Sequence, residues 1–313
     1  MFKKAYFYAA TDMEQWPALD DEATLSENLS EKAFKDCSAG SAISYGWIPP
    51  SPAMQDNQFA RMVEGNALIT LQIEEKKIPG SALKKRLSDR ISEIEARDSR
   101  KVYAKEKREL KEEIQIDMLP RTHSTYTTVN ALLMPKHNVI VVEHTSANKA
   151  EMLLNLLRET FGTLPVALLQ PDVSPASVMS QWLVNEQFPE EVHADVLGSV
   201  KLTQIDAEGT STITLKNAEI FADQVKDYLA SGYGVTEIAL ANEDMLFTIK
   251  DSLVVSGIKP TDVLKDAMNA QTEDSDAEGD ELRLAALDAD IVLGSAAIAG
   301  LYKQINTLFC TGS

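Results

Sequence analysis

The stretch "KKIPGSALKKRLSDR", residues 76–90, decides the fold. It contains the end of a predicted strand, the start of a predicted helix and a high concentration of positive charge. Pro79 and Gly80 interrupt the preceding strand-like run, and Ser81 is available to cap a helix. From Ala82 to about Ile116 there is no Pro or Gly, and helix formers dominate. The pattern predicts a protruding helical arm over residues 76–121, which we call the arm.

The apolar residues of the arm predict two helices in place of one. An apolar stripe at helical spacing ends before Asp98, and the later apolar residues lie on a different side of the projected helix. We therefore expect a break near Asp98–Ser99. The stripe consists of Leu83, Leu87, Ile91 and Ile94.

The charge of the arm is opposite to that of the rest of the chain. The 313 residues contain 30 Lys+Arg and 48 Asp+Glu, a formal net charge of −18. Residues 76–111 hold 13 basic and six acidic residues, a net charge of +7, which leaves −25 elsewhere. Since an acidic chain repels polyanions, such a run is either a solvated helix face or a surface for an anionic partner.

Helical geometry and composition support different interpretations of this charge. At 100° per residue a single ridge beside the apolar stripe would carry five basic residues, and such a ridge could follow phosphates. Composition alone favours a solvated helix with i,i+4 ion pairs such as Glu93–Arg97. The ridge consists of Arg86, Arg90, Arg97, Lys101 and Arg108.

The segments around the arm predict an α+β protein with mixed or antiparallel sheets. Residues 2–10 and 66–79 have strand patterns, and residues 24–34 predict a helix capped by Thr24 or Ser26. Residues 122–146 predict two strands about a turn at 135–138, followed by a helix at 147–161 with Gly162 as its C-cap. We assign a central domain to residues 1–75 and 122–172, and a C-terminal α+β domain to 173–313.

The sequence contains no recognisable catalytic or metal-binding motif. The four histidines lack HExxH spacing, and neither a phosphate-binding loop nor Gly-x-Ser-x-Gly occurs. Cys37 and Cys310 are isolated, which predicts free thiols. We expect no enzyme activity, no cofactor and no metal.

The chain is also expected to be cytoplasmic and to have no membrane association. The N-terminal apolar run is too short for a signal peptide, because Thr11, Asp12 and Glu14 interrupt it. We expect no window to approach the roughly 18 apolar residues of a membrane-spanning helix.

Several short segments in a fixed order resemble the RdgC family of recombination-associated proteins. They hold their order and spacing from about residue 40 to 170, and more thinly near residue 235. The segments are Tyr45-Gly46-Trp47-Ile48-Pro49-Pro50, Glu74-Glu75-Lys76-Lys77-Ile78-Pro79, Leu119-Pro120-Arg121, and Leu156-Leu157-Arg158 leading to Gly162-Thr163-Leu164-Pro165-Val166.

The resemblance implies a function for the positive charge. Proteins of this family are bacterial, nucleoid-associated and DNA-binding, and they form a closed ring of two subunits with a basic central hole. They bind double-stranded DNA with little sequence preference and restrain the RecA recombinase. The resemblance therefore implies a ring-like homodimer, non-enzymatic and located at the nucleoid, whose arm contacts phosphates.

The family pattern also implies individual residues. It places His123 where members carry a Phe that packs against the partner subunit, so a looser ring or a contact remade by Tyr126 is expected. Lys216 and Asn217 match a basic and amide pair at the other subunit contact. The implied DNA-binding residues are Lys76, Lys84, Arg90, Arg100, Lys101, Lys107, Lys111 and Arg121.

A second hypothesis places the function on the acidic surface. In this interpretation the chain is an acidic inhibitor that binds the recombinase or a nuclease directly and touches DNA weakly. The surface would include residues 273–281, a run rich in Asp and Glu.

Overall fold

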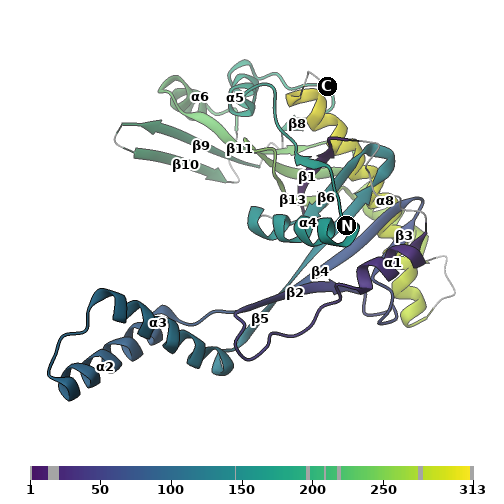
Figure 1. Cartoon of the computed structure of the whole chain (residues 1–313). Helices are drawn as coiled ribbons and strands as arrows, with labels where there is room; N and C mark the ends of the chain where they lie inside the picture. The colour runs from purple at the N-terminus through teal and green to yellow at the C-terminus, as the bar shows by residue number, and fades with distance from the viewer. Residues whose placement is uncertain are drawn as a thin grey trace.

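The structure is a computed structural model, and it describes residues 2–12, 21–144, 146–194, 198–207, 209–216, 220–273 and 278–310. Figure 1 shows a twisted sheet with helices packed on it and a helical hairpin extending from one end. All strand ladders among the described residues are antiparallel. The predicted mixed α and β content with antiparallel pairing is confirmed.

The strands follow one another along the sheet in the order β10-β9-β11-β12-β13-β1-β6-β5-β4-β2, with β3 beside β4, β7 beside β1 and β8 beside β11. Their bounds are β1 Lys4–Ala10, β2 Ile43–Ile48, β3 Ala60–Val63, β4 Asn66–Lys76, β5 Ser124–Met134, β6 Val139–Glu143, β7 Val166–Leu168, β8 His193–Ala194, β9 Ser199–Asp206, β10 Gly209–Lys216, β11 Gly234–Ala241, β12 Met245–Lys250 and β13 Val255–Pro260.

The helices are α1 Glu22–Ser30, α2 Gly80–Asp98, α3 Ala104–Met118, α4 Ala147–Phe161, α5 Pro175–Asn185, α6 Asp223–Ala230, α7 Asp262–Glu273 and α8 Asp280–Phe309. Two short 3-10 turns, Leu119–Arg121 and Pro135–His137, stand before β5 and β6. The predicted turn at 135–138 between two strands is therefore confirmed.

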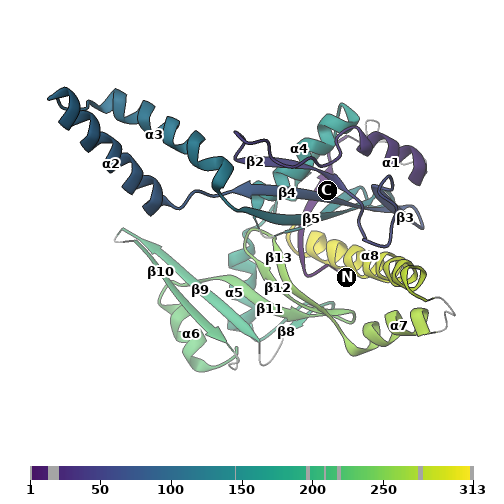
Figure 2. The same cartoon turned by 90° about the horizontal axis from the view of Figure 1, so that it is seen from below.

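Strand β1 joins the two halves of the sheet. Its first residues, Lys4 and Ala5, pair with β13, whereas Tyr6–Ala9 pair with β6. Figure 2 shows β9 to β13 side by side on one part of the molecule and β4 and β5 on the other. The two halves therefore share one strand, although the proposed division into domains stays a prediction.

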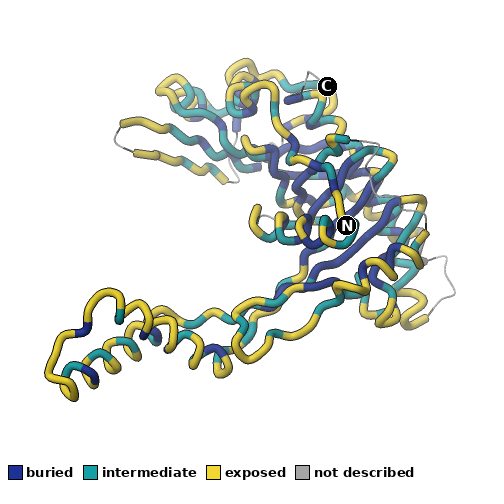
Figure 3. Tube along the Cα trace, in the orientation of Figure 1, coloured by how far each residue is buried: buried dark blue, intermediate teal, exposed yellow. Residues whose placement is uncertain are grey.

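Apolar side chains fill both faces of the N-terminal half of this sheet. Trp47, Leu71 and Val129 are buried with α4 residues on one face. Phe7 and Leu132 belong to a second cluster on the other face, where α8 packs. Figure 3 shows the buried residues concentrated in the sheet and the exposed ones along α2 and α3.

Helix α8 corrects the expectation that no segment is apolar enough to span a membrane. An 18-residue window of this 30-residue helix has a mean hydropathy of 1.7. Ile298, Leu301 and Ile305 are nearly inaccessible and belong to the core cluster shared with the sheet. Burial against the sheet accounts for the apolar composition, because a core helix needs the same residues.

Local sequence signals explain where two of the helices begin or end. The carboxylate of Asp21 accepts the Thr24 N–H at 2.8 Å, so Asp21 caps α1 in place of the predicted Thr24 or Ser26. Helix α4 ends at Gly162, which has a φ of 78°, as predicted.

The arm is a helical hairpin attached to the sheet through β4 and β5. The last β4 residue, Lys76, pairs with the first β5 residue, Ser124. Helix α2 ends at Ser99, whose φ of 49° lies in the left-handed region and reverses the chain. The predicted break near Asp98–Ser99 and the predicted pair of helices are confirmed.

Candidate nucleic-acid interface

A small apolar cluster fixes which arm residues face solvent. Ile94, Val102 and Leu110 are buried together, and Leu87 and Ile91 pack against them. Because α2 and α3 turn their apolar stripes toward each other, the basic residues that flank the stripes lie on the outside of the hairpin. All the residues predicted to bind DNA, except Lys76, are accordingly exposed.

The hairpin separates the charges of the arm into two sides. At 100° per residue, Arg86 and Arg90 lie on one flank of the α2 stripe and Lys84 on the other. In α3, Glu113 and Asp117 lie on one flank, and Lys107 and Lys111 on the other. Antiparallel packing places Arg86 and Arg90 beside Glu113 and Asp117, and these four residues do line one shared hollow. We call that flank the acid-paired side, and the flank with Lys84, Lys107 and Lys111 the lysine side.

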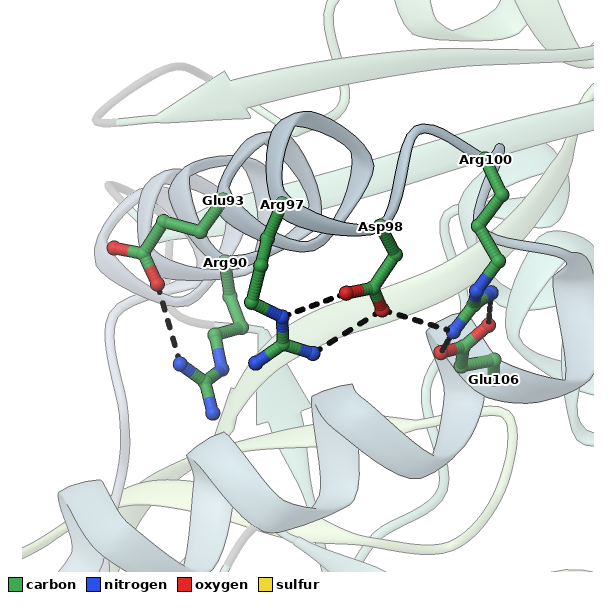
Figure 4. Close-up of polar contacts among 6 residues, drawn as sticks. All are labelled: Arg90, Glu93, Arg97, Asp98, Arg100 and Glu106. Atoms are coloured by element: carbon green, nitrogen blue, oxygen red, sulfur yellow. Dashed lines mark hydrogen bonds and ion pairs between the residues drawn. The ribbon is translucent and has the colours of Figure 1, made fainter.

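Three arginines of the arm are held by carboxylates (Figure 4). Arg90 Nη1 lies 3.2 Å from Glu93 Oε2, and Arg97 Nε lies 2.7 Å from Asp98 Oδ1. Arg100 makes two bonds of 2.7 Å to Glu106. A phosphate that approaches these arginines must compete with carboxylates already in place.

The contacts with arginine lower the pKa values of the paired carboxyl groups. Hydrogen bonding to Arg100 lowers the pKa of Glu106 below its usual range. Hydrogen bonding to Arg97 does the same to the pKa of Asp98. Both carboxylates therefore remain charged at neutral pH, and the guanidinium groups remain neutralised.

The other predicted cations are exposed and available. Within the described part of the chain, no ion pair is formed by Lys84, Lys101, Lys107, Lys111 or Arg121. Lys76 is half-buried at the root of the arm. Its ammonium group donates to the Ser38 carbonyl at 3.4 Å.

The prediction of a single basic ridge along the arm is wrong. Lys101 lies in the turn, and Arg108 lies on α3, which runs antiparallel to α2. A ridge drawn at 100° per residue requires an unbroken helix, and the left-handed Ser99 interrupts it. Positive charge is instead arranged across the two helices, on the lysine side.

A second basic feature lies at the root of the arm. A hollow of about 490 Å³ there is lined by Lys77, Arg86, Arg121 and His123, together with the apolar edges of Pro79 and Met118 and the threonines 122 and 125. His123 is exposed and enters no hydrophobic cluster in the described chain. The predicted dimer residue therefore borders a basic hollow.

Of the other residues predicted at the subunit contacts, Lys216 and Asn217 lie far from the arm in sequence. Lys216 is the exposed last residue of β10. Asn217 lies outside the described residues. Tyr126, expected to remake the subunit contact, is 54% exposed and stacks edge-on against Phe34.

A buried carboxylate holds the root of the arm in place. Glu74 is 3% exposed and accepts the Cys37 backbone N–H at 2.6 Å and the Ser124 hydroxyl. These hydrogen bonds, led by that from Ser124, lower the pKa of Glu74. Glu74 thus ties the 37–41 loop and the start of β5 to β4, where the arm leaves the sheet.

The structure also bears on the sites considered earlier. Cys37 and Cys310 are free thiols, as predicted. In the described ranges, no three His, Cys, Asp or Glu side chains are grouped so as to hold a metal ion. Residues 274–277 of the acidic surface lie outside the described residues.

Comparison with known proteins places the chain in a family. A family model described as "Putative exonuclease, RdgC" matches residues 1–311. The chain belongs to the RdgC family. It is similar to the recombination-associated protein RdgC of Colwellia psychrerythraea, with 31% identity over 94% of this chain and 91% of the relative. It is 31% identical to that of Pseudomonas aeruginosa over 87% and 86% of the two chains, and 30% identical to that of Pseudomonas fluorescens over 93% and 91%.

The resemblance inferred from sequence segments is therefore confirmed over almost the whole length of this RdgC-family chain. Sequence analysis did not identify Lys77 and Arg86 as parts of the root hollow, since Lys77 precedes a break and Arg86 was assigned to the ridge. Nor did it identify Glu106 as the partner of Arg100, because only the reversal at Ser99 brings the start of α3 back to Arg100.

Proposed function

We propose that this chain binds double-stranded DNA without sequence preference, acts as a homodimer at the nucleoid, and modulates RecA-dependent recombination by occupying DNA. In this proposal it is not an enzyme. One observation carries it: the unpaired lysines of the arm lie in a chain whose remainder is strongly acidic. The membership of a recombination-associated family supports the same assignment.

The chemistry of the lysine side suits a phosphate backbone. Lysine ammonium groups neutralise phosphates and release condensed counterions, which gives affinity independent of sequence. The apolar faces of α2 and α3 are packed against each other, so only their outer faces can contact DNA. The exposed lysines on these faces can bind phosphates without hydrogen bonding to the edges of the bases. The predicted preference is for duplex charge density, with Lys84, Lys107 and Lys111 as the principal contacts.

A homodimer is supported by surfaces left open in one subunit. Strand β10 pairs only with β9 among the described residues, so its other edge is free to pair with a second copy. Its residues are predominantly exposed, and Lys216 stands at its end. The root hollow beside His123 is the second proposed contact, and closing both would form a ring.

The test is duplex binding at several salt concentrations with a protein of measured mass. The proposal expects a dimer and a steep negative slope of log affinity against log salt, equal for unrelated sequences. Absence of binding or a flat salt response would reject it in favour of the acidic inhibitor. Incubation of end-labelled duplex with Mg²⁺ tests the non-enzymatic part, since progressive shortening would refute it.

A further inference from the structure

The open face of the C-terminal half of the sheet is basic, although the chain is acidic. In the antiparallel register, Lys201 stands opposite Glu237, and Glu237 stands opposite Lys250 on its other side. Directly opposed residues point to the same face, so these three side chains lie together. By the same argument Lys216 shares the face through Ser199, and Lys259 through Leu246.

We call this surface the basic sheet face. Its lysines are Lys201, Lys216, Lys250 and Lys259, and Lys4, opposite Ser256, extends it into β1. The reverse face packs its apolar residues, such as Val200 and Leu202, with the helices. The basic sheet face itself bears a shallow hollow, to which Ser199, Lys216, Thr248 and Lys259 contribute.

A single carboxylate stands among these lysines at the described strand positions of the face. Glu237 Oε1 lies 3.1 Å from Lys201 Nζ and 3.5 Å from Lys250 Nζ. Its side chain is 27% exposed, so the three groups interact at the surface of the sheet. The carboxylate stands where the oxygen of a bound phosphate would otherwise bridge the two ammonium groups.

We propose that the basic sheet face is a second contact surface for the DNA backbone, and that Glu237 limits its affinity by occupying Lys201 and Lys250. This inference rests on the proposed function, because it assumes that the ligand is DNA. It adds a surface outside the arm and a residue that weakens binding.

The side chains of the face fit phosphates better than a protein partner. Between the lysines stand the hydroxyl groups of Thr203, Thr212, Thr214 and Thr248, which are donors of the kind that contact phosphate and sugar. Its described strand positions hold no aromatic residue, whereas protein interfaces depend on aromatic and Arg anchors. Apart from Ile205 at its outer edge, the face offers a protein partner few large apolar side chains to bury.

The dimensions and position of the face also agree with a duplex. Lys216 on β10 and Lys259 on β13 are four strand spacings apart, roughly 19 Å at about 4.8 Å per spacing. This span equals the rise of about five or six base pairs along the duplex axis, at roughly 3.4 Å each. Figure 1 shows the β9–β10 hairpin and the α2–α3 hairpin extending to the same side of the molecule, so one duplex can approach both.

The experiment measures binding of the full-length protein to a random-sequence duplex across a salt series. Glu237→Gln keeps the shape of the side chain and releases both lysines, so the salt slope should steepen by about 1–2. Glu186→Gln is the matched control, because it removes the same charge from the Glu186–Lys226 pair of α5 and α6 on the opposite face. Its slope should equal that of the parent.

A second variant does not depend on Glu237. Lys4 and Lys259 are exposed and lie outside the proposed subunit contacts, so Lys4→Gln with Lys259→Gln should fold normally and lower the slope by about 2. Equal slopes for the parent and this double variant would refute the proposal that the basic sheet face contacts DNA. Equal effects of Glu237→Gln and Glu186→Gln on the slope would refute the proposal that Glu237 limits the affinity. If the parent does not bind duplex at all, the proposed function fails together with the inference. If arm variants weaken binding but sheet variants do not, the inference alone fails.

Discussion

Two triple variants of the arm, each losing three positive charges, separate direct phosphate contacts from general electrostatic attraction. The first replaces Lys84, Lys107 and Lys111 by Gln, and these exposed lysines lie on the lysine side without carboxylate partners in the described chain. The second replaces the three ion-paired arginines, Arg90, Arg97 and Arg100. Long-range attraction falls similarly in both, so the difference between them reports direct contact.

The expected magnitude follows from counterion release. Each lost phosphate contact lowers the slope of log affinity against log salt by about 0.9, so the lysine triple should lower it by about 2.7. Between 50 and 200 mM salt, the ratio of parent affinity to variant affinity should then shrink about 40-fold. The arginine triple should lower the slope by less than about 1, because its guanidinium groups are already occupied by carboxylates.

Fluorescence anisotropy with a labelled random duplex measures both slopes on the same protein preparations. Circular dichroism and sedimentation establish that each variant keeps its helices and its association state. Equal slopes for the two triples, or a larger loss for the arginines, would refute the division of the arm into a lysine side and an acid-paired side. The DNA contacts would then have to be assigned to the guanidinium groups.

Three further predictions concern stability and assembly. Glu74→Gln should reduce stability at pH 7, since a neutral amide replaces the carboxylate that accepts charge-assisted hydrogen bonds from the Cys37 N–H and the Ser124 hydroxyl. Because the folded-state pKa of Glu74 is lowered, its contribution is present above its unfolded value of about 4.3 and is lost as pH falls through the folded value, so the difference between parent and variant should vanish in acid denaturation curves. Ser99→Gly should stabilise the arm by about 0.5 kcal/mol, because relief of a left-handed conformation exceeds the added entropy of glycine, and faster exchange of arm amides would contradict this. His123→Phe should tighten the dimer by about 1–2 kcal/mol if the ring closes beside the root hollow, and an unchanged dissociation constant in sedimentation would exclude that contact.

The sequence predicts the parts of the fold that depend on local pattern. The periodicity of apolar residues predicts the two helices of the arm and the break at Asp98–Ser99. Proline and glycine predict the turn at 135–138 and the C-cap at Gly162. The apolar window of α8 is hard to recognise in the sequence, because small residues such as Gly294 and Ala297 separate its larger apolar side chains.

The sequence could not predict contacts made by register. Lys201, Glu237 and Lys250 are ordinary strand residues until the pairing of β9, β11 and β12 places them in a row. Likewise, nothing in the spacing of Arg100 and Glu106, six residues apart, indicates a bidentate pair across a turn. Both arrangements depend on tertiary pairing, which a residue pattern read along one chain does not contain.

The choice of side chain on the two sides of the arm has a physical reason. Arginine has a planar group that binds carboxylate through two parallel hydrogen bonds, and Arg100 uses it to clamp the turn onto Glu106. Lysine is a flexible and strongly hydrated point charge, which suits contact with a backbone whose register does not matter. The arginines therefore stiffen the hairpin so that the lysines are presented at fixed positions. On this reasoning Arg100→Lys should keep the charge of the arm yet loosen the turn, and faster amide exchange at Lys101 and Val102 with an unchanged salt slope would show that the two roles are separate.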